Sequence, residues 1–105
     1  MIQNIFNNIP EKLPDELIEI LSENENIRIE RIVSRGHTSQ PDNWYDQENN
    51  EFVLLVSGAA TLRFKKDNRA VKMKAGDYLI ISAHEQHRVE MTSSDEDAIW
   101  LAIHF

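Results

Sequence analysis

Residues 51–58 read EFVLLVSG, and this stretch is the strongest strand signal in the chain. It is apolar at nearly every position, as expected of a strand that is covered on both faces. A polar segment comes directly before it and reads HTSQPDNWYDQENN over residues 37–50. This segment is either a solvated loop or a source of side chains that point into a pocket, and at this stage both alternatives stay open.

Similar short strands follow on both sides of this stretch. Residues 27–34 alternate between two faces, and five further strand patterns come after residue 58 with turn residues between them: AATLRFKKD, AVKMKAG, DYLIIS, HRVEM and AIWLAIHF. About seven short strands at regular spacing are typical of an all-β sandwich or barrel.

One short helix is predicted before the strands, near residues 14–22. Pro14 is acceptable in a first helical turn, and Asp15 and Glu16 suit the positive end of the helix dipole. An apolar stripe follows, formed by Leu17, Ile18, Ile20 and Leu21. We therefore expect an N-terminal arm and short helix in residues 1–26, and a β-barrel in residues 27–105.

Composition limits the classes of function. The 105 residues are enough for one domain, and 41% hydrophobic and 28% charged residues are ordinary for a soluble protein. No apolar run approaches the ~20 residues that span a bilayer, so no membrane partner is expected. The missing cysteines and the lack of a signal-peptide pattern favour the cytoplasm. A net charge of −7 without a basic cluster argues against nucleic acid as a partner.

The stretch GDYLIISAHEQHRVE, residues 76–90, carries the first candidate functional residues. His84 and His87 lie at its bend, and strand alternation places His87 on one face with Val89 and Met91. A histidine on this apolar face needs a hydrogen-bond partner. That partner is either a backbone carbonyl, with no functional consequence, or a group in a binding site.

Glu51 is the second candidate, and its environment depends on the orientation of its strand. If Phe52, Leu54 and Val56 pack between the sheets, Glu51 lies on the solvent side. In the opposite orientation Glu51 enters the interior, where an unpaired carboxylate is costly. The inward position therefore requires a cation or hydrogen-bond donors nearby.

These patterns resemble the cupin superfamily, and in particular small single-domain bacterial cupins of the RmlC-like group. The residues that carry the resemblance are RIVSRGH, WYDQENNEFVLLVSG, KAGDYLIISAHEQHRVE and AIWLAIHF, which span most of residues 27–105. The resemblance implies a double-stranded β-helix, or jelly-roll barrel. Glu51 stands at the correct spacing before Gly58 to match the glutamate of the first cupin motif. His87 stands at the correct spacing after Gly76 to match the metal-binding histidine of the second motif.

The departures from the family pattern concern the metal site. The two histidines of the first motif should stand at 44 and 46 or at 45 and 47, but neither pair is histidine here. With the first spacing, Asp46 is an oxygen donor at a histidine position. With the second, Tyr45 and Gln47 face the pocket, which disfavours a metal. In the second motif, Ser82, His84 and Met91 replace the usual proline, glycine and asparagine.

The resemblance implies a barrel pocket that binds a divalent metal (Mn, Fe, Zn or Ni) and a small-molecule ligand, with no reaction assigned. The expected metal ligands are His87, Glu51 and Asp46. The alternative is a metal-free cupin that binds or senses a small molecule. Further pocket-lining residues or alternative ligands are His37, Trp44, Tyr45, Gln47, His84 and His104.

For the other three histidines, the sequence alone favours roles outside the site. His37 and His84 lie in loops and are expected to be solvated, and His104, beside the C-terminus, is expected to be exposed or packed at an edge. The resemblance also implies a homodimer. Ile2, Ile5 and Phe6 fit an apolar arm that lies on a partner or on its own sheet.

Overall fold

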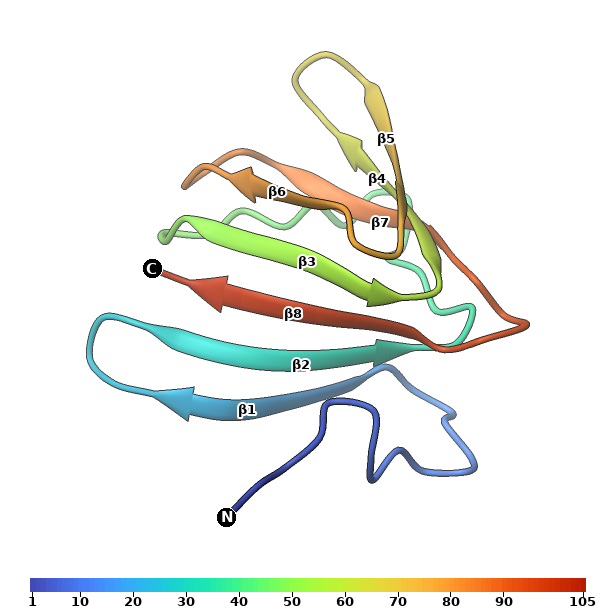
Figure 1. Cartoon of the computed structure of the whole chain (residues 1–105). Coiled ribbons are helices and arrows are strands. Elements are labelled where there is room, and N and C mark those ends of the chain that lie inside the picture. The colour runs from blue at the N-terminus through green and yellow to red at the C-terminus, as the bar shows by residue number, and fades with distance from the viewer.

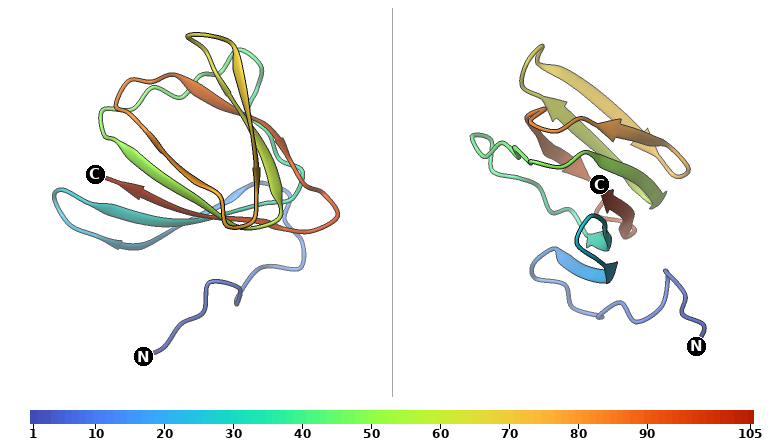
Figure 2. Two further views of the ribbon diagram at one scale, coloured as in Figure 1. Left: turned by 45° about the horizontal axis from the view of Figure 1, so that its top comes forward. Right: turned by 90° about the vertical axis from the view of Figure 1, so that its left-hand side faces the viewer.

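The computed structural model describes all 105 residues and contains strands but no helix. The strands are β1 Leu17–Glu23, β2 Arg28–Ser34, β3 Glu51–Ser57, β4 Ala59–Phe64, β5 Arg69–Lys74, β6 Tyr78–Ile81, β7 His87–Thr92 and β8 Ala98–His104. They form a five-stranded sheet in the order β1-β2-β8-β3-β6 and a three-stranded sheet in the order β5-β4-β7 (Figure 1). The two sheets curve around a common interior (Figure 2), which confirms the all-β jelly-roll expectation.

The predicted N-terminal helix is wrong, because this segment forms strand β1. It pairs antiparallel with β2 from Leu17 opposite Val33 to Glu23 opposite Arg28. The spacing of the apolar residues in this segment fits the period of a helix as well as the period of a strand. A helix of this length is only marginally stable by itself. The unpaired edge of β2 offers backbone hydrogen bonds that a helix could not accept, so tertiary pairing overrides local propensity.

The hydrophobic core lies between the two sheets. Strand β3 turns Val53 and Leu55 toward this core, so Glu51 also points inward. Of the two orientations that the sequence left open, the structure therefore has the second. The core cluster consists of nine buried residues: Val53, Leu55, Ala60, Leu62, Phe64, Met73, Ile81, Ala98 and Trp100.

A β-bulge in β7 breaks the expected alternation after Val89. Leu62 pairs with Val89, whereas the preceding residue of β4, Thr61, pairs with Met91. The extra residue rotates the strand, so Met91 is 42% exposed and Thr92 is buried. The prediction that Met91 shares the inner face with His87 is therefore wrong, although Val89 does share it.

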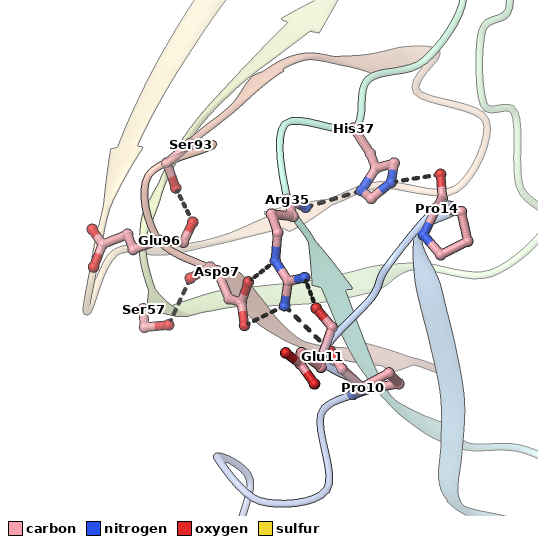
Figure 3. Close-up of polar contacts among 9 residues, drawn as sticks. All are labelled: Pro10, Glu11, Pro14, Arg35, His37, Ser57, Ser93, Glu96 and Asp97. Atoms are coloured by element: carbon pink, nitrogen blue, oxygen red, sulfur yellow. Dashed lines mark hydrogen bonds and ion pairs between the residues drawn. The ribbon is translucent and has the colours of Figure 1, made fainter.

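Side chains from the loop after β2 hold the segment that precedes β1 (Figure 3). Arg35 forms an ion pair with Asp97 and donates to the backbone carbonyls of Pro10 and Glu11. His37 Nδ1 accepts a hydrogen bond from the Arg35 N–H, and its Nε2–H donates to the carbonyl of Pro14. Both ring nitrogens of His37 thus help to hold the segment before β1.

No helix is present that could cross a membrane.

Candidate functional site

A cavity of about 240 Å³ opens between the two sheets. Its polar residues come from the ends of β2, β3, β7 and β8, from the segment before β3, and from Glu16 just before β1. The cavity thus combines a polar end with hydrophobic walls, as ligand pockets usually do. Its apolar walls are Ile18, Ile32, Val53, Leu62, Ile81, Val89 and Trp100.

Glu51 is the central polar residue of this cavity. Its side chain is only 9% exposed, and its Oε1 atom has no hydrogen-bond partner in the protein. His87 Nε2 lies 3.8 Å from this oxygen, which is too far for a hydrogen bond. Burial raises the pKa of the Glu51 carboxyl, and this effect exceeds the opposing influence of His104 and His87. The carboxyl group therefore lacks a donor or cation that it would need when ionised.

His87 is held in place by its backbone and by its other ring nitrogen. Its Nδ1–H donates to the carbonyl of Glu85 at 2.9 Å, which directs Nε2 toward Glu51. The backbone of His87 pairs with Tyr45 through hydrogen bonds of 2.7 and 3.2 Å. The Tyr45 and His87 rings lie 5.6 Å apart between centroids. In the neutral ring, Nε2 keeps a lone pair for a ligand.

The segment before β3 presents Tyr45 and Gln47 to the cavity and turns Asp46 away from it. Asp46 instead bonds to His84 on the rim, where the Oδ1–Nδ1 distance is 2.8 Å. Gln47 Oε1 is buried and has no partner, like Glu51 Oε1. The structure thus places Glu51 and His87 close together and leaves Asp46 outside the cavity. Of the two motif spacings, it has the one that turns Tyr45 and Gln47 toward the cavity.

His104 is buried, so the expectation of an exposed or edge position is wrong. It is 6% exposed and lines the cavity, because β8 lies in the middle of the five-stranded sheet. Its Nε2–H donates to Glu30 Oε1 at 2.8 Å, and Glu30 Oε2 lies 3.1 Å from Arg28 Nε. Glu30 was missed as a site residue, although the strand alternation along residues 27–34 puts it on one face with Arg28 and Ile32.

Besides Asp46, three of the candidate residues lie outside the cavity. His37 holds the N-terminal segment, and His84 lies on the rim with a 66% exposed side chain. The Trp44 ring lies beside two cations outside the cavity. The Arg88 guanidinium carbon is 5.3 Å from the centroid of this ring, and Lys65 Nζ is 5.9 Å from it. These side chains shape or stabilise the surroundings of the cavity without lining it.

Comparison with known proteins places this fold in a family. Residues 31–104 match the family described as the cupin domain. The chain belongs to this family. A protein of Ralstonia eutropha JMP134, named as a proposed mannose-6-phosphate isomerase, is 39% identical, with a TM-score of 0.94 over 99% of this chain and 96% of that one.

More distant structures share the fold alone. An RmlC-like cupin of Methanocaldococcus jannaschii with a double-stranded β-helix is 14% identical, with a TM-score of 0.71 over 92% of this chain and 85% of that one. A cupin superfamily protein of Desulfitobacterium hafniense is 16% identical, with a TM-score of 0.75 over 92% and 83%. No curated protein matches the chain significantly.

The residues at the cupin metal positions do not form the usual metal-binding set. With the motif spacing that turns Tyr45 and Gln47 into the cavity, these positions hold Tyr45, Gln47, Glu51 and His87, so one imidazole and one carboxylate remain as strong ligands. No group of three or more His, Cys, Asp or Glu side chains is arranged around a common point for a metal ion. Zinc, iron and manganese sites are normally built from at least three such side chains.

Proposed function

We propose that this cupin binds one small organic molecule in its barrel cavity and needs no resident metal for this. The supporting observation is Glu51, which is almost fully buried at the cavity and has an oxygen without a partner. A buried carboxylate without a partner is costly, and proteins keep such groups mainly at functional sites. The cavity of about 240 Å³ lies just below the ~300–1,000 Å³ of drug-sized sites, so the ligand is small.

The proposed roles follow from the positions of the side chains. Glu51, His87 and Gln47 hold the polar head of the ligand at one end of the cavity. The hydrophobic walls contact the rest of the ligand and exclude water from it. Tyr45 is 38% exposed and lines the cavity, so its ring covers part of the opening. Binding or sensing requires nothing further, and no reaction is assigned.

A ligand screen tests this proposal. We expect small polar metabolites, with sugars and sugar phosphates included because of the Ralstonia relative, to yield at least one ligand that shifts backbone resonances of Leu62, Val89 and His87. Glu51→Gln should weaken that ligand by tenfold or more, whereas Glu96→Gln, on the surface, should not. The proposal fails if every ligand found acts only on resonances outside the cavity.

A divalent metal ion is the second candidate occupant. It is favoured by the Nδ1 hydrogen bond of His87 to a backbone carbonyl, which is typical of metal-bound histidines. His87, Glu51 and the Gln47 amide oxygen would hold the ion, and Asp46 could join only if its segment shifted by one residue. Elemental analysis of untagged protein decides between the candidates. Stoichiometric Mn, Fe, Zn or Ni that is lost in His87→Ala would replace the metal-free proposal.

We also propose that the chain forms a homodimer through the outer face of the five-stranded sheet. Phe52 stands between Ile80 and Ile103 in the register of this face, and Leu54 stands between Tyr78 and Leu101. Ile80 and Tyr78 are 59% and 66% exposed. Contiguous apolar surface of this kind is typical of interfaces. Light scattering should give twice the 12.2 kDa chain mass, and Ile80→Glu should give the mass of one chain.

The cytoplasm remains the proposed location. The chain has no cysteine, which agrees weakly with a reducing compartment. A fluorescent fusion expressed in the source cell tests this location directly.

A further inference from the structure

We propose that the polar head of the ligand is a protonated primary amine. The inference rests on the proposed binding function and adds the chemical class of the ligand. Glu51, Gln47 and His87 line the cavity, and their acceptor atoms are Glu51 Oε1, Gln47 Oε1 and His87 Nε2. The two oxygens have no partner in the protein, and the Nε2 atom of a neutral His87 carries a lone pair because Nδ1–H donates to Glu85. All three atoms accept hydrogen bonds.

An ammonium group matches this set of acceptors better than other small polar groups. A primary ammonium carries three N–H donors and no acceptor. A hydroxyl donates only once, and a carboxylate or phosphate would place its own oxygens against unpartnered oxygens. A divalent metal would find one imidazole, one carboxylate and one amide oxygen here, a weaker set than the three strong ligands of usual zinc, iron or manganese sites. The three donors of an ammonium thus match the three acceptors in number.

The charges around the cavity also favour a cation. Among the lining residues, the carboxylates are Glu16, Glu30 and Glu51, whereas Arg28 is the only Lys or Arg. The guanidinium of Arg28 is already paired with Glu30. With neutral histidines, the lining therefore has an excess of negative charge. A buried ammonium would compensate for it next to Glu51, where the ion pair is formed away from solvent.

A second, polar cavity of about 300 Å³ adjoins the first and shares Arg28, Gln47 and His104 with it. Its other charged residues are all acidic: Glu23, Glu25 and Glu48. A cation that approaches along this side passes a row of carboxylates in a chain of net charge −7. Such a field raises the local concentration of cations and speeds their association, and it repels anions.

Two aromatic residues add a further preference. Tyr45 and Trp100 both line the inner cavity. Aromatic faces attract ammonium groups through the ring quadrupole, most strongly where water is excluded. A small amine with a short apolar tail would therefore find acceptors at its head and hydrophobic walls around its tail.

The experiment compares three probes that share one carbon chain: n-butylammonium, 1-butanol and butyrate. Each is titrated into the full-length protein and followed by NMR at the backbone amides of Glu51, Leu62 and His87. We expect butylammonium alone to shift these amides and to saturate. Glu51→Gln should weaken butylammonium by tenfold or more. Glu96→Gln removes the same formal charge from a surface turn and should bind butylammonium as the wild type does.

The outcomes separate this inference from the proposed function. If butanol or butyrate binds in the cavity as tightly as butylammonium, the amine class is overturned while the binding function stands. If butylammonium leaves the cavity amides unshifted at roughly 10 mM, where a millimolar site would be mostly filled, the inference is also overturned. Unchanged affinity in Glu51→Gln overturns it too, because the proposed ion pair would not exist. The broad ligand screen tests the binding function separately.

Discussion

Two histidine–carboxylate pairs link the same two segments of the chain, and they differ in almost every physical property. Inside the cavity, Glu51 and His87 are 9% and 7% exposed at the side chain, and 3.8 Å separates Oε1 from Nε2. On the rim, Asp46 and His84 are 45% and 66% exposed, and their hydrogen bond is 2.8 Å long. The shorter contact is thus the exposed pair on the rim, where water can replace the hydrogen bond at little cost. Burial, and not contact distance, therefore determines which pair dominates the energetics.

A third histidine–carboxylate pair has a short hydrogen bond, like the pair on the rim, and is buried, like the pair in the cavity. His104 and Glu30 are 8% and 11% exposed at the side chain, with Nε2 and Oε1 2.8 Å apart. The three pairs thus separate the effect of burial from the effect of a satisfied hydrogen bond. Substitutions at each pair test this separation, and we expect their effects to decrease in the order given below.

Glu30→Ala should have the largest effect on stability. It removes the acceptor of a buried imidazole and one partner of Arg28, and such losses cost about 3 kcal/mol of unfolding free energy. Glu30→Gln keeps an oxygen for the His104 N–H and should cost about 1 kcal/mol. Urea unfolding of both variants measures the difference. Equal losses would mean that the charge at Glu30, and not its hydrogen bond, stabilises the pair.

Glu51→Leu should stabilise the ligand-free protein by about 1 kcal/mol. The substitution removes a buried carboxylate whose Oε1 has no partner and adds apolar surface beside Val53 and Ile81. Thermal unfolding without ligand should show a higher Tm, and the same variant should lose ligand binding. A lower Tm would show that Glu51 already has a stabilising partner in the free protein.

The stability contributed by Glu51 should decrease as pH rises above its ordinary pKa of 4.5. Because burial raises the pKa of Glu51 in the fold, the folded chain holds this proton over a range in which the unfolded chain has lost it. Stability then falls with pH across this range and levels off above the folded pKa. The difference in unfolding free energy between the wild type and Glu51→Gln, measured from pH 4 upward, isolates this slope. A flat difference would show that Glu51 titrates normally.

Most of the fold could be predicted because its strands carry their own signals. A continuous apolar run identified β3, and short strand patterns separated by turn residues identified β2 and β4 to β8. Motif spacing placed Glu51 and His87 at the cavity. Strand β1 could not be identified in this way, since only the edge of β2 distinguishes it from a helix. His104 was misplaced because closeness to the C-terminus suggested exposure, whereas β8 is a central strand.

Which of Asp46 and Gln47 faces the interior could not be settled from the sequence. In an extended segment, a shift of one residue exchanges the inner and outer side chains. Both spacings are compatible with the cupin motif. The structure resolves the choice through backbone bonds of Tyr45 to His87 and of Gln47 to His84, which fix the inward side of this segment.

The rim pair should have the smallest effect. Asp46→Asn keeps a hydrogen-bond acceptor for His84, and exposed pairs contribute at most about 1 kcal/mol, so stability should change within that range. Affinity for the cavity ligand should also stay within about twofold, since Asp46 does not line the cavity. Urea unfolding and the ligand titration check both values. If Asp46→Asn instead weakens binding as strongly as Glu51→Gln, the segment presents its other face in solution, and Asp46 would then join Glu51 and His87 as the metal hypothesis requires.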